Sequence, residues 1–491
     1  MTSVEFLGAK DIPFCSLFNS KQENKEFFTM SLWLSHSSLM RPEIPDWLEE
    51  LAQKVAANDP RIQNLELTHQ RIDDAQARFL ATALEDNTRI RSFILSCFSI
   101  YDDGAISLAS VLGKSGCLQK VQLRDIRTSR EMNIFFESLL QNKSVEEFSL
   151  RHCQIAIPSA KILSGLLKSH HNLQEIRLVD TQIPAISFSY FCSGIKDSVS
   201  IRRLYLINAE IDGESGARSL GAMLRRNTSL HEVHLSENEL GDEGAAVLVD
   251  GLLFNSTLMK LDLRSNGIGG EGALSLASLI KQSPSLTSLY VGMNSIGNVG
   301  AEALARGLAN SRLEKLDLSD NGIGVSGAQA ISQMLCTNTN LQELNLSFNN
   351  IGDDGASYIA NILDRNVTLR CLSLRRNYIN NKGAYAFAVK LPFMNGLKEL
   401  VMTKNSVSKE GALALLDGLR GNMELEYLHV EEKASEPILR EIFHWISLNR
   451  AGRRIFRNAE LPATLWPTIL SNSNDNIEVL YHFLRQKPEI L

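Results

Sequence analysis

The sequence holds few side chains whose types and spacing suit catalysis or cofactor binding. Gly113, Lys114 and Ser115 resemble the end of a phosphate-binding loop, in which backbone amides and a lysine hold a nucleotide. That motif also needs a glycine five residues before Gly113, and Leu108 occupies that position. We therefore expect no nucleotide and no other cofactor.

His231 and His234 are the residues most suggestive of a metal site. The zinc motif of metalloproteases places two histidines four residues apart on one helix, whereas these two are closer and lie in a segment with the periodicity of a strand. Residues an odd number apart on a strand face opposite sides, so we expect His234 alone to project from the open face. The sequence predicts no metal site and no enzymatic activity.

Composition and terminal sequence indicate the cellular setting. The chain has 491 residues and a formal net charge of -6, which argues against a bulk attraction to nucleic acid or anionic membranes. Its seven cysteines form no C-x-x-C pair, as is usual in a reducing compartment. The first residues lack the pattern of a secretion signal, and no apolar run is long enough to cross a membrane. We expect a cytoplasmic protein, with the nucleus as the alternative.

The elements that must position any functional side chain are repeats of about 28 residues, which run from Leu230 to Leu425. Leucines or equivalent residues stand at offsets zero, three and five, and a Gly-Ala pair stands at offsets fourteen and fifteen. A buried side-chain amide can bond the backbone of neighbouring units, so an asparagine at offset eight predicts a ladder. The asparagines are Asn238, Asn266, Asn294, Asn321, Asn349, Asn377 and Asn405.

One repeat shows how strand and helix alternate. Leu261 and Leu263 are predicted to point into the core, while Lys260, Asp262 and Arg264 point to the opposite face, which is the periodicity of a strand. After Gly272 the apolar spacing changes to that of a helix with one buried stripe. The sequence therefore predicts an α/β fold, a curved solenoid with parallel strands on the concave face and helices on the convex face.

The domain organisation follows from where the repeats are regular. Less regular units extend back to about residue 62, but their offset-eight position holds residues such as Thr181 and Ala209. We predict an N-terminal helical cap and leader over 1–61, degenerate repeats over 62–229, regular repeats over 230–432 and a C-terminal helical cap over 433–491.

The two caps are predicted from amphipathic segments outside the array. Asp46 is expected to cap a helix whose Leu48 and Val55 face the core. At the other end a helix from about 438 to 448 and a second helix near 477–484 are expected, and the first should cover the last repeat through Ile442, Phe443, Trp445 and Leu448. A docking role for this tail, through Arg450, Arg453, Arg454 and Arg457, is the alternative.

Residues 230–425 resemble the ribonuclease-inhibitor-like subfamily of leucine-rich repeats, which has the form LxxLxLxxNxIGxxGAxxLAxxL. That subfamily includes ribonuclease inhibitor, the Ran GTPase-activating protein and the sensing arms of NACHT-type receptors, and the resemblance implies that the array holds another macromolecule. The strings LNRAGRR and LWPTIL also resemble tails of uncharacterised leucine-rich-repeat proteins of unicellular algae.

This resemblance implies a non-enzymatic interaction scaffold or recognition subunit with another protein as its partner. The alternative is a Ran-type GTPase activator acting on a small GTPase in trans. Partners are expected to include neither nucleic acid nor membrane, and the chain is expected to be monomeric alone. Offsets two, four, six and seven face the concavity, and the partner-binding residues predicted there are Tyr205, His234, Asp262, Tyr290, Met293, Asp317, Asn345, Phe348, Arg375 and Arg376.

Overall fold

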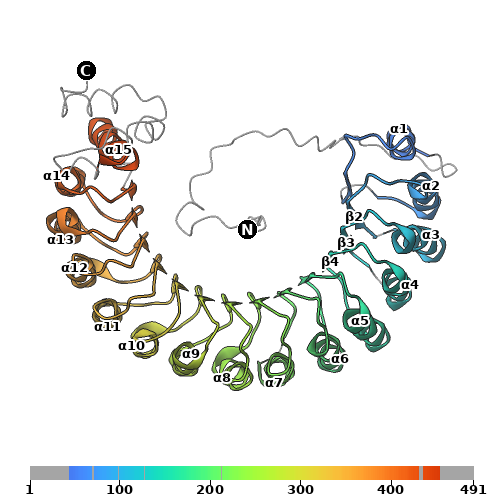
Figure 1. Ribbon diagram of the computed structural model, residues 1–491, viewed down its shortest axis with the longest axis horizontal. Helices are drawn as coiled ribbons and strands as arrows, with labels where there is room; N and C mark the ends of the chain where they lie inside the picture. The colour runs from blue at the N-terminus through green and yellow to red at the C-terminus, as the bar shows by residue number, and fades with distance from the viewer. Residues whose placement is uncertain are drawn as a thin grey trace, which may run out of the picture. The chain divides into compact units, whose positions relative to one another are not determined.

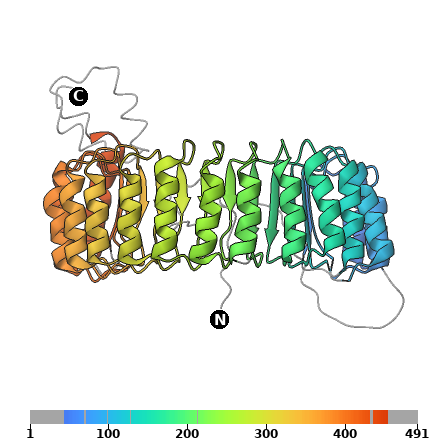
Figure 2. The ribbon, with the colours of Figure 1, turned by 90° about the horizontal axis from the view of Figure 1, so that it is seen from below.

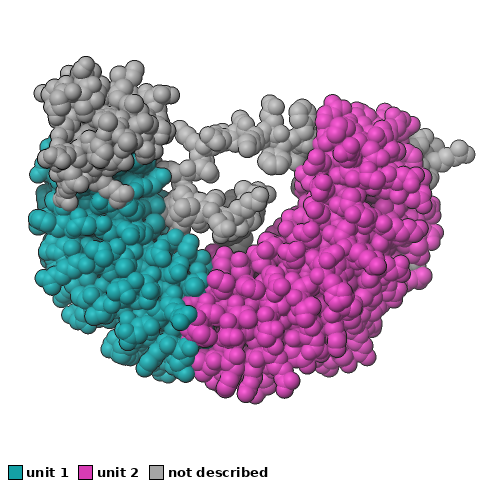
Figure 3. Space-filling view, viewed as in Figure 1, with its two compact units in different colours: residues 1–23, 268–282, 287–491 teal, residues 24–267, 283–286 magenta. Residues whose placement is uncertain are grey.

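The structure is a computed structural model that describes residues 44–68, 71–97, 99–126, 128–211, 213–430 and 435–453. In these residues fourteen strands alternate with fifteen α-helices (Figure 1). The chain forms two compact units (Figure 3). We call the unit that holds residues 24–267 and 283–286 the N-terminal unit, and the unit that holds 268–282 and 287–491 the C-terminal unit.

The elements of the N-terminal unit alternate regularly. Its helices are α1 (Asp46–Ala56), α2 (Asp74–Leu84), α3 (Asp102–Lys114), α4 (Ser129–Gln141), α5 (Ile157–Ser169), α6 (Ala185–Lys196), α7 (Gly213–Leu224) and α8 (Gly241–Leu252). Its strands are β1 (Asn64–Leu67), β2 (Ser92–Ser96), β3 (Lys120–Arg124), β4 (Glu147–Arg151), β5 (Glu175–Val179), β6 (Arg203–Ile207), β7 (Glu232–His234) and β8 (Lys260–Asp262).

The C-terminal unit continues the same alternation. Its helices are α9 (Gly270–Gln282), α10 (Gly297–Leu308), α11 (Val325–Leu335), α12 (Gly352–Leu363), α13 (Asn381–Lys390), the short 3₁₀ helix η2 (Leu391–Phe393), α14 (Lys409–Gly421) and α15 (Glu436–Arg450). Its strands are β9 (Ser288–Tyr290), β10 (Lys315–Asp317), β11 (Glu343–Asn345), β12 (Cys371–Ser373), β13 (Glu399–Val401) and β14 (Tyr427–His429).

Within each unit the strands are parallel and pair in chain order, so equivalent positions of successive repeats lie side by side. Leu261 of β8 pairs with Val233 of β7, and Leu316 of β10 pairs with Leu289 of β9. These side chains are buried. In each unit the strands lie on the inner side of the curve and the helices on its outer side (Figures 1 and 2). The predicted α/β solenoid is confirmed.

The asparagine ladder is confirmed by its hydrogen bonds. The side-chain amide of Asn349 donates to the carbonyls of Leu318 and Leu346, both at 2.9 Å, and its oxygen accepts from the amide of Ile323 at 2.9 Å. Each such asparagine therefore joins its own turn to the preceding repeat. In the less regular repeats Thr181 replaces it, and the Thr181 hydroxyl donates to the Val179 carbonyl at 2.9 Å.

The Gly-Ala pairs allow neighbouring helices to approach closely. A Cβ atom built on Gly300 would lie 2.8 Å from the Cβ of Ala273, and one on Gly355 would lie 3.0 Å from the Cβ of Ala328. Any larger side chain at the glycine would push the two helices apart. The glycine of one repeat thus packs on the alanine of the repeat before it.

A second column of buried asparagines lies at the ends of the helices, and it was not predicted from the sequence. Asn338 donates to the carbonyl of Leu308 at 2.7 Å, in the preceding helix, and accepts from the amide of Leu341 at 2.8 Å. The same arrangement recurs at Asn142, Asn227, Asn255, Asn366 and Asn422. Because Asn142 and Asn227 precede the regular repeats, this column also orders the degenerate ones.

The structure corrects one detail of the predicted N-terminal cap. Helix α1 begins at Asp46 and its N-cap position is Pro45, so no side chain caps this helix. Asp46 instead lies in the first turn, where a carboxylate interacts favourably with the helix dipole. Leu48 and Val55 are buried as predicted, and α1 packs against α2.

At the other end, helix α15 packs against α14 and β14. Ile442 and Leu448 are buried as predicted, but Phe443 is 62% exposed, so its predicted role in covering the last repeat is wrong. Ile446 is buried instead, because it lies four residues after Ile442 on the same helix face. The expected helix near 477–484 lies outside the described residues.

Candidate functional site

The strands of the N-terminal unit place one row of side chains across the inner face. Arg177, Tyr205, His234 and Asp262 occupy register-paired positions of β5, β6, β7 and β8. Each lies between two core residues of the chain, so the alternation of side chains along extended backbone turns it away from the core. Neighbouring parallel strands lie about 4.8 Å apart, which brings adjacent members of the row into contact.

Three of these side chains form a continuous stack. The guanidinium carbon of Arg177 lies 3.8 Å from the centre of the Tyr205 ring, and that ring stacks on the imidazole of His234 with centroids 4.2 Å apart. Burial raises the pKa of Tyr205 to about 12, although the charge of Arg177 acts in the opposite direction. Tyr205 therefore remains a neutral phenol at physiological pH. His234 is buried, so the half-buried ring of Tyr205 and the guanidinium of Arg177 are the parts of the stack that a partner can reach.

An ionic network fixes the other end of the row. The Nδ1 atom of His234 lies 3.3 Å from Asp262, and its Nε2 atom lies 3.5 Å from Glu232. Burial by itself would raise the pKa of Asp262, but hydrogen bonds from His234 and Arg264 outweigh it and leave that pKa well below its ordinary value. Asp262 is 1% exposed. Its carboxylate therefore orients His234 and Arg264 and has little surface to offer a partner.

A second ion-pair cluster supports the Arg177 side of the stack. Glu175 is buried and accepts hydrogen bonds from Arg177 and from Arg203. The hydrogen bond from Arg203 raises the pKa of that guanidinium. Arg177 was not predicted as a site residue, although it stands at the same offset as Tyr205. The positive charge of Arg177 and its position at offset four, which faces the concavity, could have identified it from the sequence.

In the C-terminal unit the predicted residues divide into two groups. Tyr290, Asp317 and Asn345 are register-paired on β9, β10 and β11. Asp317 is buried and accepts from the amide of Ser319 at 2.9 Å, and Asn345 accepts from the amide of Ser347 at 3.0 Å. The side-chain oxygens of Asp317 and Asn345 therefore each accept a hydrogen bond from the backbone amide two residues further along the chain.

The other predicted residues of this unit lie in or next to the turn that follows each strand. Met293, Phe348 and Arg376 all have positive φ, and Met293 is 57% exposed. The guanidinium carbons of Arg375 and Arg376 lie 5.9 Å and 5.4 Å from the centre of the Phe348 ring. The structure thus brings Phe348, Arg375 and Arg376 together. Tyr205, His234 and Asp262 form their own cluster in the N-terminal unit.

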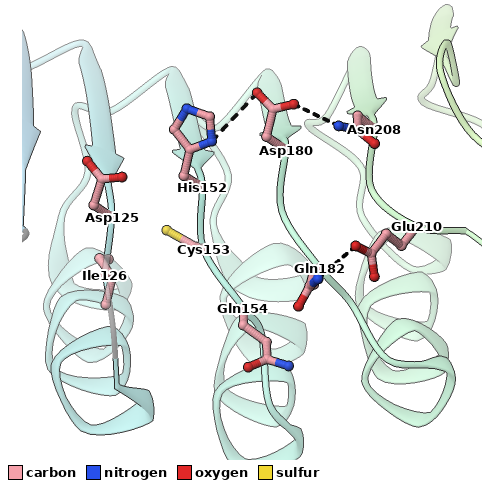
Figure 4. A pocket seen from close by; sticks show the side chains of 9 residues that line it. All are labelled: Asp125, Ile126, His152, Cys153, Gln154, Asp180, Gln182, Asn208 and Glu210. Atoms are coloured by element: carbon pink, nitrogen blue, oxygen red, sulfur yellow. Dashed lines mark hydrogen bonds and ion pairs between the residues drawn. The ribbon is translucent and has the colours of Figure 1, made fainter.

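A polar pocket of about 490 Å³ in the N-terminal unit was not predicted (Figure 4). Asp180 accepts a hydrogen bond from Asn208 at 2.9 Å and lies 3.8 Å from Nδ1 of His152, and Gln182 donates to Glu210 at 2.7 Å. Asp125, His152, Asp180 and Asn208 all have positive φ. Asparagine and aspartate favour that conformation, so their recurrence after successive strands was the missed signal.

The sulfur atom at this pocket is not an activated nucleophile. Burial raises the pKa of Cys153 to about 11, and its thiol donates to the carbonyl of Arg151 at 3.2 Å. A protonated thiol reacts poorly, so the neighbouring His152 does not make a reactive pair with it. The pocket can offer hydrogen bonds and charge to a bound group.

The described part of the chain contains no cluster of three or more histidine, cysteine or acidic residues arranged to hold a metal ion. None of its helices is both long enough and apolar enough to cross a bilayer. Gly113 and Lys114 lie in the last turn of α3, whereas a phosphate-binding loop precedes its helix.

Comparison with known proteins agrees with the repeat architecture. A family model described as a leucine-rich repeat matches residues 226–249, 254–277, 282–305, 309–332, 337–360 and 365–388. Ribonuclease inhibitor of Mus musculus is 25% identical over 184 residues, which are 37% of this chain and 34% of that protein. Ribonuclease inhibitor of Sus scrofa is 27% identical over 188 residues, 38% of this chain and 35% of that protein.

The chain therefore spans about a third of the length of these relatives. Among solved structures, the yeast complex of Rad7 and Elc1 matches with a TM-score of 0.41 and 17% identity, over 79% of this chain and 92% of that chain.

Proposed function

Because the chain is a leucine-rich-repeat protein with repeats similar to those of ribonuclease inhibitor, we propose that it is a non-enzymatic interaction scaffold that binds a protein partner. The partner contacts the inner, strand-lined face of the repeats. The row of Arg177, Tyr205 and His234 is the observation that carries this proposal, because stacked aromatic and arginine side chains are the commonest anchors of protein interfaces.

The rigidity of the strand layer supports the same function. In repeats that hold both asparagines, the two columns bond the turns at both ends of the repeat to the repeat before it, as Asn349 and Asn338 illustrate. Side chains on such a layer lose little conformational entropy when a partner binds, which favours affinity. A fixed inner face therefore suits recognition of one partner shape.

Capture of the partner from the native cell tests the proposal. The inner-face variant carries Tyr205→Ala and Met293→Ala. The control variant carries Ile186→Ser and Val299→Ser, at apolar positions that are 60% and 65% exposed on α6 and α10. Wild type and the control are expected to capture the same protein, identified by mass spectrometry, and the inner-face variant is expected to lose it. Loss from the control alone would reject an inner-face site.

A turnover assay separates this proposal from GTPase activation. GTP hydrolysis by a purified Ran-type GTPase is measured with and without the chain at equal concentration. The scaffold proposal expects no acceleration, whereas a catalytic increase at substoichiometric amounts of the chain would support the GTPase activator.

We further propose that the isolated chain is a monomer of the cytoplasm or nucleus that binds neither nucleic acid nor membrane. Free thiols at Cys97, Cys192 and Cys336 are in keeping with a reducing compartment. Light scattering of the purified protein and imaging of a tagged chain in its own cell test the two parts separately.

A further inference from the structure

The turns that follow the strands of the C-terminal unit hold side chains that the fold itself does not require. Met293, Asp320, Phe348, Arg376 and Lys404 stand at equivalent positions and have φ between +51° and +60°. The turns that follow β3 to β13 all adopt this left-handed conformation at the equivalent position, yet a bulky residue such as phenylalanine disfavours it. Core packing and turn geometry therefore give no reason for Phe348 at this place.

The backbone fixes the spacing of these positions. The amide of Phe348 donates to the carbonyl of Arg375 at 2.7 Å, and the amide of Arg376 donates to the carbonyl of Thr403 at 3.0 Å. Phe348, Arg376 and Lys404 therefore stand on adjacent turns of successive repeats, with a spacing of about 4.8 Å between neighbouring backbones. We call Phe348, Arg375, Arg376, Tyr378 and Lys404 the basic rim.

The basic rim combines cations with aromatic rings. Arg375 and Arg376 flank the Phe348 ring, and Tyr378 is 67% exposed. Arg376 and Lys404 are exposed, and no carboxylate of the described residues forms a salt bridge with either of them. Among the described residues at the equivalent turn positions of this unit, Asp320 is the acidic one, one repeat before Phe348.

Several other cations of the C-terminal unit are neutralised within the chain. Lys382 pairs with Asp354 at 2.7 Å, Lys390 with Asp364 at 2.8 Å and Lys398 with Glu424 at 2.8 Å. The contrast is informative because adjacent like charges repel unless an anion lies between them. A bound anionic group would relieve that repulsion between Arg376 and Lys404.

We propose that the basic rim binds an acidic segment of the protein partner, with carboxylates on Arg376 and Lys404 and an apolar side chain on Phe348. This inference rests on the proposed scaffold function and specifies the chemistry of the partner. Arginine binds carboxylates through two parallel hydrogen bonds, and an aromatic ring flanked by guanidinium groups offers an apolar surface beside those charges.

Fluorescence anisotropy with three labelled peptides tests the charge preference. The first peptide has six glutamates around one phenylalanine and one leucine, the second has glutamines in place of the glutamates, and the third has lysines. The full chain is expected to bind the glutamate peptide at least about tenfold more tightly than the glutamine peptide, and this preference should weaken as salt rises. Equal binding of the first two peptides overturns the proposal.

Matched variants locate the binding. Arg376→Gln with Lys404→Gln should weaken binding of the glutamate peptide about tenfold, and Phe348→Ala should weaken it about threefold. Lys382→Gln, on the outer helix α13, removes one exposed cation of the same unit and should change nothing. Circular dichroism confirms that each variant is folded. An equal loss in Lys382→Gln would mean a general charge effect and would overturn the assignment to the rim.

Other occupants give distinct results. Self-association of the wild type that the rim variant abolishes would mean that a second copy is the occupant, and tighter binding of a single-stranded oligonucleotide than of the glutamate peptide would mean a nucleic acid. Either result overturns the proposal. If the native partner is captured by the rim variant as well as by wild type but is lost with Tyr205→Ala and Met293→Ala, the rim inference fails while the scaffold function stands.

Discussion

The ring of Tyr205 stacks on the imidazole of His234 at a centroid distance of 4.2 Å and an interplanar angle of 11°. The two residues belong to successive strands and are paired in register. Stacking at this distance holds His234 between the ring and two carboxylates, those of Glu232 and Asp262. Tyr205 on β6 therefore contacts His234, which belongs to the ionic network of β7 and β8.

The stack predicts a difference between two substitutions of Tyr205. Tyr205→Phe keeps the ring and should retain both stability and capture of the partner. Tyr205→Ala removes contacts with Arg177 and His234 and should lower the free energy of unfolding by about 1 to 3 kcal/mol. Urea unfolding measures the stability of the two variants. Equal destabilisation by Tyr205→Phe and Tyr205→Ala would mean that the hydroxyl, and not the ring, stabilises the fold.

The asparagine ladder predicts a large effect of removing one buried amide. Asn349→Ala leaves the Leu318 carbonyl without its side-chain donor and the Ile323 amide without its side-chain acceptor, and should cost about 1 to 3 kcal/mol. The adjacent Asn350 is exposed, so Asn350→Ala is the matched control and should cost less than about 0.5 kcal/mol. Thermal or urea unfolding compares them. Unchanged midpoints for Asn349→Ala would contradict the ladder.

The second asparagine column predicts an equal effect at the helix ends. Asn338→Ala removes the donor to the Leu308 carbonyl and the acceptor of the Leu341 amide, so it should also cost about 1 to 3 kcal/mol. If Asn338→Ala matches the wild type in urea, the helix-end column contributes nothing to stability.

Asn294→Ala, at a half-buried position of the first column, should lower the free energy of unfolding by an amount toward the lower end of that range.

Helix α15 predicts a contrast between two neighbouring apolar residues. Leu448 is fully buried, so Leu448→Ala should cost about 2 to 5 kcal/mol and increase hydrogen exchange in β14. Phe443→Ala, at an exposed position, should have little effect on either quantity.

Deletion from residue 433 onward should expose Leu425 and Leu428 and cause fraying or self-association. A truncated protein that stays monomeric with normal protection over 397–430 would instead identify the tail as a docking module.

The ionic network at Asp262 predicts a dependence of stability on pH. Its pKa is lower in the folded chain than the ordinary value of 3.8, so the folded state favours the ionised form. The contribution is complete above about pH 4 and is lost as pH falls from there toward the folded pKa. Asp262→Asn should therefore be less stable than wild type at pH 7 and lose less stability between pH 5 and pH 3.

Urea midpoints at several pH values check this prediction. The control Asp250→Asn, at an exposed position on α8, should follow the wild-type curve. If Asp262→Asn loses as much stability on acidification as wild type, other carboxylates account for the acid sensitivity.

The cysteines predict selective chemical labelling. Cys336 is exposed, whereas burial raises the pKa of the Cys192 thiol well above its usual range. Of these two thiols, a reagent at pH 8 should modify Cys336 in the folded protein and Cys192 only when the chain unfolds. Mass spectrometry of digested samples identifies the sites, and Cys336→Ser should remove the label from the peptide that holds residue 336. Rapid modification of Cys192 in the folded protein would show that helix α6 opens readily.

The sequence by itself determined the fold and the direction of most side chains. The offsets of Leu261, Asp262 and Leu263 predicted a strand with its leucines inward, and the column that includes Asn349 predicted the turn bonds. Both predictions were confirmed because the same residue pattern recurs in each regular repeat, so one local structure is indicated many times. The inner-face positions of Tyr205 and His234 followed from the same rule.

Only the tertiary structure decided which of these side chains meet and which remain available. Tyr205 and His234 are 29 residues apart, whereas Tyr290 and Asp317 are 27 apart, so register and not a fixed spacing brings each pair together. The sequence also did not reveal that Arg264 engages Asp262 or that Phe443 faces outward. Strand and helix periodicity determines the side of a residue, but burial and ion pairing depend on how far neighbouring side chains reach across the strands.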